Sequence, residues 1–301
     1  MDFKCIPGSD SWDKVMIVDK GWSSDKKYFI ETKEGSKLLL RISNVDEEET
    51  KRKDYDLIAL IAETGIRMSK PVGFGRCDEE SIYTLFTWVE GDDLEEVLPT
   101  LSKEVQYSLG YKAGETLSLI HGCTCEKNNE VWVVRFNRKI DRNIEVYGRC
   151  PIKFEGSDHI INYINEHRVL LNERPQVLQH GDYHVGNMVI DNGEIGIIDF
   201  NRLDCGDPWE EFNRISFSAT ISGEFASGMI NGYFNDSVPD DFFKLLALYI
   251  GSNQLSSIPW AMKFGDDDVD YMLKQARMVL SWYDNFKSYI PNWYVSGKLK
   301  P

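Results

Sequence analysis

One short region constrains the fold of this chain more than any other. Residues 180–187 read His-Gly-Asp-Tyr-His-Val-Gly-Asn, and residues 197–200 read Ile-Ile-Asp-Phe. Phosphoryl transfer needs a carboxylate that orients a hydroxyl and accepts its proton, and hard oxygen ligands that hold Mg²⁺ against nucleotide phosphates. Asp182 can supply the first function, and Asn187 and Asp199 can supply the second.

Short apolar segments surround these three side chains. Met188–Ile190 and Ile195–Ile198 are expected to form two strands, and the Asp-Asn-Gly sequence at 191–193 is typical of a hairpin turn. The polar residues are therefore expected on loops held by buried strands, where catalytic side chains are often found. Asp199 is the most informative of them, because a carboxylate at the end of a buried strand requires a cation or a hydrogen-bond network.

Length and composition limit the class of protein. The chain has 301 residues, enough for one large domain or two lobes, and 42% of them are hydrophobic, which is ample for a core. It contains no apolar run of 18 residues, and its N-terminus lacks a basic-then-apolar signal segment. Six scattered cysteines, two of them spaced CxC, do not match a zinc site. We therefore expect free thiols, no membrane partner and a cytoplasmic location.

The net charge bears on the partner. A charge of −15 argues against nucleic acid, which requires Lys and Arg stripes. It is compatible with a cationic substrate, because an acidic cleft raises the local concentration of cations. Solubility alone is the alternative explanation. A monomer or weak dimer is expected.

The first 90 residues have the pattern of a mostly antiparallel sheet with one helix. The helix is expected within 47–64, ending at Gly65. The expected strands are Val15–Val18, Tyr28–Thr32, Leu38–Ile42, Met68–Phe74 and Ser81–Val89.

The rest of the chain has mainly helical patterns. Helices are expected at 103–121 and at about 158–173, whereas residues 122–156 look less regular. Residues 209–301 are expected to be mostly helical, with Gly223, Pro239 and Pro259 as breaks.

The motif region resembles the catalytic region of the aminoglycoside phosphotransferase family. These antibiotic kinases have the protein-kinase fold and are grouped with choline kinase and other kinases of small alcohols. The resemblance is carried by His180-Gly181-Asp182, Asn187, Ile198-Asp199-Phe200 and Gly206-Asp207-Pro208. It implies that Asp182 is the catalytic base, that Asn187 and Asp199 are magnesium ligands, and that His180 and Asp207 are structural residues near the site.

The same resemblance assigns residues to the nucleotide phosphates. In this fold the third strand supplies a cation that is paired to an acid on the helix, which implies Arg41 and Asp54, with Glu49 as a rival for the acid. A loop between the first two strands would cover the phosphates with Gly21, Ser23 and Ser24. That loop lacks a GxGxxG pattern, so an ordinary hairpin is the alternative.

A hinge is implied at residues 88–94. Backbone groups of Thr87 and Val89 would bind the purine edge, with Phe86 behind it. Recognition through the backbone leaves no side-chain signature, so both ATP and GTP stay open as co-substrates.

The sequence thus predicts an α+β, protein-kinase-like bilobal fold. Residues 1–90 would form the nucleotide-binding lobe and 91–301 the larger, mostly helical catalytic lobe. The expected activity is magnesium-dependent transfer of the γ-phosphate of ATP or GTP to a hydroxyl of a small molecule. An aminoglycoside-like antibiotic is the first acceptor class, and a macrolide, an amino alcohol such as choline, or a sugar is the alternative. A catalytically weak nucleotide-binding regulator and a metal-dependent hydrolase are the other classes.

Two acidic clusters are candidates for holding a cationic acceptor. One lies beside the motif hairpin and the other lies in the C-terminal region. Their candidate residues are Asp204, Glu210, Glu211, Asp266 and Asp270. Solvated surface is the alternative for both, and Asp266–Asp268 also fit a helix start.

Overall fold

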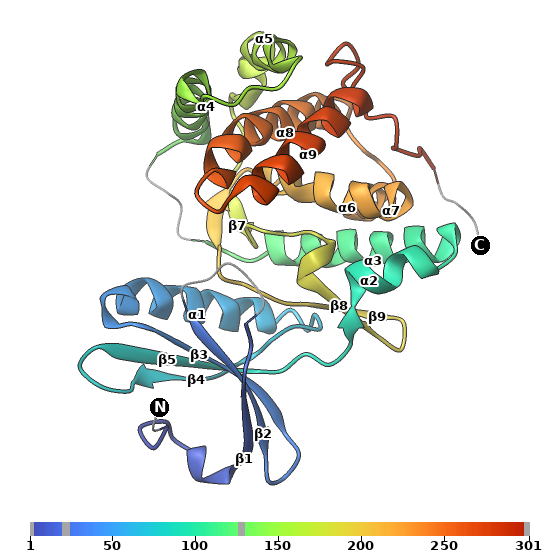
Figure 1. The fold of residues 1–301 in the computed structure, drawn as a ribbon. Helices are drawn as coiled ribbons and strands as arrows, with labels where there is room; N and C mark the ends of the chain where they lie inside the picture. Colours follow the sequence, from blue (N-terminus) through green and yellow to red (C-terminus); the bar gives the residue numbers. More distant parts are fainter. Residues whose placement is uncertain (1–2, 20–24, 126–129, 298–301) are drawn as a thin grey trace. The chain divides into compact units, whose positions relative to one another are not determined.

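The computed structural model describes residues 3–19, 25–125 and 130–297 (Figure 1). The chain divides into two compact units. Unit 1 comprises Met1–Asp92 and Met188–Leu203, and unit 2 comprises Asp93–Asn187 and Asp204–Pro301. The first boundary lies two residues beyond the position expected from the sequence. Residues 188–203 group with unit 1, although the sequence placed them in the larger lobe.

Unit 1 is built on an antiparallel sheet of five strands in the order β1-β2-β3-β5-β4. The sequence predicted such a sheet, and most strands differ from the expected ranges only at their ends. The strands are β1 (Trp12–Ile17), β2 (Lys26–Thr32), β3 (Lys37–Asn44), β4 (Pro71–Arg76) and β5 (Ser81–Thr87). β4 starts three residues later than expected, because Met68 forms a bridge with Ile197 instead.

Alternation along the strands gives this sheet one apolar and one mixed face. The apolar face packs into a core against the N-terminal segment, which contributes Phe3 and Trp12. Its buried residues are Ile6, Ile30, Leu40, Ile42, Tyr83 and Leu85. Arg41 and Ser43 alternate with Leu40 and Ile42, so their side chains leave from the opposite face.

Helix α1 (Glu48–Ala62) packs on that opposite face. The rings of Phe74 and Phe86 lie 5.6 and 5.9 Å from the ring of Tyr55 in α1. A single 3-10 turn, η2 (Val45–Glu47), leads into the helix from β3. The expected helix at 47–64 is therefore confirmed, with a slightly earlier end.

The predicted hairpin is present as β8 (Met188–Asp191) and β9 (Glu194–Ile197). Its two turn residues, Asn192 and Gly193, have φ values of 50° and 79°. Positive φ at both central residues defines the turn type that matches the twist of paired strands. The tight turn fixes the register of β9, and Asp199 follows two residues after the end of that strand.

Unit 2 is mainly helical, as expected. It also contains a short antiparallel pair, β7 (Val177–Gln179) with β10 (Asp204–Gly206). Its α-helices are α2 (Leu94–Val97), α3 (Lys103–His121), α4 (Trp132–Arg149), α5 (Ser157–His167), α6 (Ile215–Ile221), α7 (Gly223–Tyr233), α8 (Asp240–Ala261) and α9 (Asp266–Trp282). Its 3-10 helices are η3 (Leu98–Thr100), η4 (Arg168–Leu171), η5 (Val185–Asn187) and η6 (Glu210–Arg214). The other short elements of the chain are η1 (Ser9–Ser11) in unit 1 and β6 (Asp92–Asp93) at the boundary between the units.

Helices α3 and α7 pack unusually closely. A Cβ atom on Gly110 would lie 2.0 Å from the carbonyl oxygen of Phe225, and one on Gly228 would lie 2.2 Å from that of Tyr107. Only glycine allows the two backbones to approach in this way. The close pair supports β7 and therefore the chain segment that follows it, which carries the motif.

Two expectations for unit 2 were wrong. Residues 122–156 contain helix α4, whose buried positions Trp132, Phe136 and Ile140 recur every four residues. Asn and Arg residues between them obscured this pattern. Pro259 does not break its helix, since α8 continues through it to Ala261. Within the described part of the chain, no helix is long and apolar enough to cross a membrane.

Candidate active site

The motif loop in unit 2 is held by its own turn. Gly181 has a φ of 82°, and its N–H donates to both carboxylate oxygens of Glu211 at 3.0 and 3.2 Å. The N–H of Asp182 donates to Nδ1 of His180 at 3.3 Å. Two side chains thus bind consecutive backbone amides, which fixes the path of the chain immediately before and at Asp182.

The carboxylate of Asp182 lies among polar groups and remains 17% exposed. Nε of Arg214 lies 3.4 Å from Oδ1, and Nε2 of His184 lies 3.8 Å from the same oxygen. The amide Nδ2 of Asn187 donates to the backbone carbonyl of Asp182 at 2.8 Å. This bond orients the Asn187 side chain.

Glu211 is the buried support of this loop. Its side chain is 1% exposed, and Nε2 of His121 lies 3.7 Å from it. Burial raises the pKa of Glu211, but His121, His180 and the Gly181 N–H outweigh that effect and hold the pKa below its ordinary value. Nδ1 of His121 lies 2.9 Å from the hydroxyl of Tyr233. The expected acceptor role of Glu211 is therefore a wrong prediction, because a buried carboxylate directed at the loop cannot reach a substrate.

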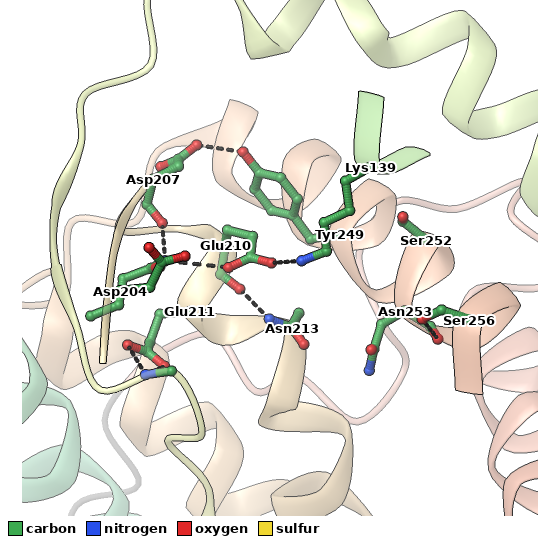
Figure 2. A network of polar contacts seen from close by, with 12 residues as sticks. Lys139, Asp204, Asp207, Glu210, Glu211, Asn213, Tyr249, Ser252, Asn253 and Ser256 are labelled. Atoms are coloured by element: carbon green, nitrogen blue, oxygen red, sulfur yellow. Dashed lines mark hydrogen bonds and ion pairs between the residues drawn. The ribbon is translucent and has the colours of Figure 1, made fainter. Parts of the chain in front are cut away.

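Asp207 is the centre of a second buried network, and Figure 2 shows its contact with Tyr249. Arg174 donates to its two oxygens at 2.7 and 2.8 Å, and the Tyr249 hydroxyl donates to it as well. The N–H of Trp209 also donates to Asp207, at 2.9 Å, and the Arg174 guanidinium stacks on the Trp209 ring. These contacts are those of a structural residue.

Two further candidates, Asp204 and Glu210, are paired to basic residues of α4. Asp204 forms an ion pair with Arg135, and Glu210 forms one with Lys139 at 2.8 Å. Figure 2 shows Glu210 between Lys139 and Asn213. The missed helix α4 therefore neutralises two of the three acids beside the motif hairpin that the sequence assigned to the acceptor.

Asp266 and Asp270 are exposed and lie in the first turns of α9. Acidic residues at this end interact favourably with the helix dipole. Their position agrees with the helix start that the sequence offered as the alternative.

In unit 1, Arg41 occupies the expected position on β3, but its partner differs from the expected acids. Nε and Nη2 of Arg41 lie 2.9 and 2.8 Å from Oδ2 of Asp25. Glu49 instead pairs with Lys53 on the exposed side of α1. Burial raises the pKa of Asp54, and the positive charges of Lys51 and Arg41 only partly oppose this. The charge of Arg41 thus acts on the pKa of Asp54, but the carboxylate that Arg41 bonds to is that of Asp25.

Sequence reasoning missed Asp25, although a signal was present. Lys27 lies opposite Arg41 in the register of β2 and β3. Continuing that antiparallel register places residue 25 opposite residue 43, and the Ser43 hydroxyl donates to Asp25 at 2.8 Å. Alternation along β2 puts Asp25 and Lys27 on the same face as Arg41.

Asp199 follows β9 and has a backbone conformation that is rare for residues other than glycine, with φ of 66°. Nη1 of Arg41 lies 3.2 Å from its Oδ1, and the side chain is 31% exposed. Residues in such conformations cluster at functional sites. The predicted requirement for a cation beside this carboxylate is met by Arg41.

Each unit carries one of the two side chains that the sequence assigned to Mg²⁺, Asp199 in unit 1 and Asn187 in unit 2. A partly exposed carboxylate at Asp199 and an oriented amide at Asn187 are the hard oxygen ligands that Mg²⁺ prefers. Among residues 3–19, 25–125 and 130–297, no three His, Cys, Asp or Glu side chains form a metal cluster.

The hinge residues limit how a purine could bind. The N–H of Thr87 donates to the carbonyl of Lys70 at 2.8 Å, and the N–H of Trp88 donates to that of Lys37 at 3.0 Å. The N–H groups of Thr87 and Trp88 are therefore already engaged within the sheet region. Phe86 and Val89 are buried beside it. Gly21, Ser23 and Ser24, expected at the phosphates, lie outside the described residues.

Comparisons with known proteins identify solved structures with a similar fold. The GDP complex of wild-type aminoglycoside 2'-phosphotransferase-IIIa has a TM-score of 0.71 at 14% identity, with 93% of this chain and 96% of that chain covered. Amicoumacin kinase hAmiN in complex with AMP-PNP, Ca²⁺ and Ami has a TM-score of 0.65 at 14% identity, with 95% and 92% covered. A choline/ethanolamine kinase family protein from Mesorhizobium loti has a TM-score of 0.68 at 13% identity, with 95% and 94% covered.

These likenesses confirm the expected kinase-like α+β fold. No curated protein matches the chain. The model of the phosphotransferase enzyme family matches residues 14–243, which is well over half of the sequence and includes Asp182, Asn187 and Asp199. The chain therefore belongs to the phosphotransferase enzyme family.

Proposed function

We propose that this phosphotransferase is a magnesium-dependent kinase that moves the γ-phosphate of ATP or GTP to a hydroxyl of a small molecule. The observation that carries the proposal is the support of Asp182. Its loop is fixed by Glu211 and His180, and its carboxylate still has an exposed fraction of 17%. A rigidly placed and partly accessible carboxylate is what a catalytic base requires.

In the proposed reaction, Asp182 accepts a hydrogen bond from the acceptor hydroxyl. The hydroxyl oxygen forms a bond to the γ-phosphorus, the bond from that phosphorus to the β,γ-bridging oxygen breaks, and the nucleoside diphosphate leaves. The hydroxyl proton passes to Asp182. Arg214, at 3.4 Å, keeps the Asp182 carboxylate in place during the transfer. Such chemistry depends mainly on positioning and electrostatics.

Asn187 and Asp199 are proposed as the residues that hold Mg²⁺. The ion, when bound, would neutralise negative charge on the nucleotide phosphates. Asn187 contributes an amide oriented by its bond to Asp182, and Asp199 contributes a carboxylate oriented by Arg41. Arg41 would turn its Nη1 side toward the phosphates.

The purine is proposed to bind the hinge through the Thr87 carbonyl and the Val89 backbone, with Phe86 behind it. The engaged N–H groups of Thr87 and Trp88 support this assignment. Because the hinge offers backbone atoms rather than selective side chains, ATP and GTP both remain co-substrates to be tested.

The acceptor is proposed to be an aminoglycoside-like alcohol, with an antibiotic-resistance role, and the net charge of −15 supports a cationic molecule. A second class is a small alcohol such as a macrolide, choline or a sugar. Within this second class Arg214 favours the neutral acceptors, a macrolide or a sugar, because a guanidinium repels an ammonium group placed beside Asp182. Amino groups of an aminoglycoside would have to lie farther away.

A screen of nucleotide consumption tests the proposal. ATP and GTP would each be offered with aminoglycosides, amicoumacin, macrolides, choline and sugars, and the product checked for a mass gain of one phosphoryl group. The Asp182→Asn variant is the matched control. Phosphorylated acceptor with the wild type but not with this variant supports the proposal. Nucleotide binding without phosphorylation of any acceptor class would favour a regulator instead.

A further inference from the structure

The Arg41 guanidinium is held from two sides by carboxylates of unit 1. Its Nε and Nη2 both approach Oδ2 of Asp25, at 2.9 and 2.8 Å. Its Nη1 faces Oδ1 of Asp199 at 3.2 Å. One edge of the guanidinium is thus bonded to Asp25, and the opposite end is directed at Asp199. The Asp25 contact decides where the Nη1 end points.

Asp25, the residue immediately before β2, is a fixed anion. Its side chain is 1% exposed, and it accepts hydrogen bonds from Arg41, from the Ser43 hydroxyl at 2.8 Å and from Lys51 Nζ at 3.0 Å. A buried carboxylate is stable only with such partners. Their bonds also hold its pKa below the ordinary value in spite of burial.

Helix α1 contributes a cation to this cluster, not the acid that the family resemblance implied. Lys51, in the first turn of α1, bonds to Asp25, and its side chain is mostly buried. Asp54 lies one turn later in α1. Burial raises the pKa of Asp54, whereas the pKa of Asp25 is held below its ordinary value. Lys27 lies across from Arg41 on β2. Two cations, Arg41 and Lys51, therefore bond to one fixed carboxylate, and Arg41 also faces Asp199.

We propose that Asp25 is the positioning residue that aims Arg41 at the nucleotide phosphates, with Lys51 tying α1 to the same carboxylate. The inference rests on the proposed function, since it assumes that Arg41 binds phosphate. It assigns to the start of β2 the task that the family resemblance gave to Asp54. Asp54 then has no part in aiming Arg41.

Binding of a fluorescent nucleoside diphosphate tests this without any acceptor. Asp25→Asn keeps the shape of the side chain but removes its charge, so we expect the Kd to rise about tenfold or more, as for loss of a charge-assisted hydrogen bond. Asp54→Asn is the matched control and should bind like the wild type. Equal Kd values for Asp25→Asn and wild type, or a larger rise in Asp54→Asn, would overturn the proposal.

A double-mutant cycle separates positioning from a merely structural role. If Asp25 acts through Arg41, Asp25→Asn should have little further effect on the Kd in an Arg41→Met background. A full additional rise in that background would show that Asp25 acts independently of Arg41. If Asp25→Asn fails to fold, the double variant Asp25→Asn with Lys51→Met replaces it in the cycle. This double variant removes one anion and one cation of the same ion pair together.

The binding assay also distinguishes this inference from the proposed function. If the wild type binds no nucleotide, the kinase proposal itself fails. If the wild type binds nucleotide and Asp25→Asn binds it equally well, only the role of Asp25 fails. Thermal unfolding of each variant, measured without nucleotide, confirms that the compared proteins are folded.

Discussion

Nε of Arg214 lies 3.4 Å from the carboxylate of Asp182 in unit 2. Arg214 ends η6, the same short helix that contains Glu211, whose carboxylate binds the amide of Gly181. The short helix η6 thus contacts the motif loop at two points, the backbone N–H of Gly181 and the side chain of Asp182. Glu211 and Arg214, which the sequence analysis did not place beside the loop, therefore both help to position it.

The first prediction concerns the base itself. Asp182→Asn should lower kcat by roughly 10²–10⁴, the usual loss for a general base, because the amide cannot accept the hydroxyl proton. Nucleotide affinity should stay near that of the wild type, since the phosphate ligands are other residues. Steady-state kinetics on the identified acceptor, with nucleotide binding measured in parallel, gives both numbers. Near-normal turnover would remove Asp182 from this role.

The second prediction concerns Arg214. Arg214→Met should lower kcat by about ten- to a hundredfold, as expected for loss of a charged contact to the base. The KM for nucleotide should change little, and Arg214→Lys should recover part of kcat. Arg149→Met is the control, because Arg149 is an exposed arginine at the end of α4. A nucleotide KM that rises while kcat is preserved would assign Arg214 to another task.

Prediction from the sequence succeeded where the signal is local. The hairpin at β8 and β9 follows from an Asp-Asn-Gly turn between short apolar runs, and α3 has the expected bounds of 103–121. The spacing of Asp182, Asn187 and Asp199 pointed to the enzyme class that the family match confirms. Each of these features can be predicted from residues that are close together in the sequence.

Prediction failed where a partner comes from elsewhere in the chain. Asp25 lies 16 residues before Arg41, and their contact depends on the register of β2 and β3. Asp204 and Glu210 looked like acceptor ligands because α4, which supplies Arg135 and Lys139, went unrecognised. Charge counted along the sequence does not reveal which carboxylates are already paired.

The third prediction is that Asp199→Ala abolishes the dependence of nucleotide binding on Mg²⁺. A strand-end carboxylate that is 31% exposed is suited to a hard cation, and alanine offers no ligand. Titrating nucleotide with and without Mg²⁺ measures the effect. Asp56→Ala, at an exposed position of α1, is the control. Wild-type metal dependence in Asp199→Ala would make Asp199 a structural residue.

The fourth prediction concerns the acceptor. If the acceptor is cationic and is held by the exposed acids of α9, its KM should rise with salt, because such contacts are screened over about 8 Å at physiological ionic strength. Asp266→Asn combined with Asp270→Asn should raise KM and weaken its salt dependence. Asp240→Asn, at the exposed start of α8, is the control. A KM that is independent of salt, or a best acceptor without an amine, would favour the neutral-alcohol class.

The last prediction uses the pH dependence of Asp54. Burial holds the pKa of Asp54 above its ordinary value of 3.8. As pH rises past 3.8, the unfolded chain therefore releases this proton before the folded chain does, so the contribution of Asp54 to folding stability falls and stays unfavourable at neutral pH. Asp54→Asn removes the carboxylate, and the variant should be more stable than the wild type at pH 7. This gain should vanish at low pH, where both folded and unfolded Asp54 are protonated. Thermal unfolding across the pH range measures the difference, with Asp56→Asn as the exposed control on the same helix. A variant that is less stable at pH 7 would show that the Asp54 carboxylate contributes a favourable contact with Arg41 or Lys51, and would return Asp54 to the role that the family resemblance implied.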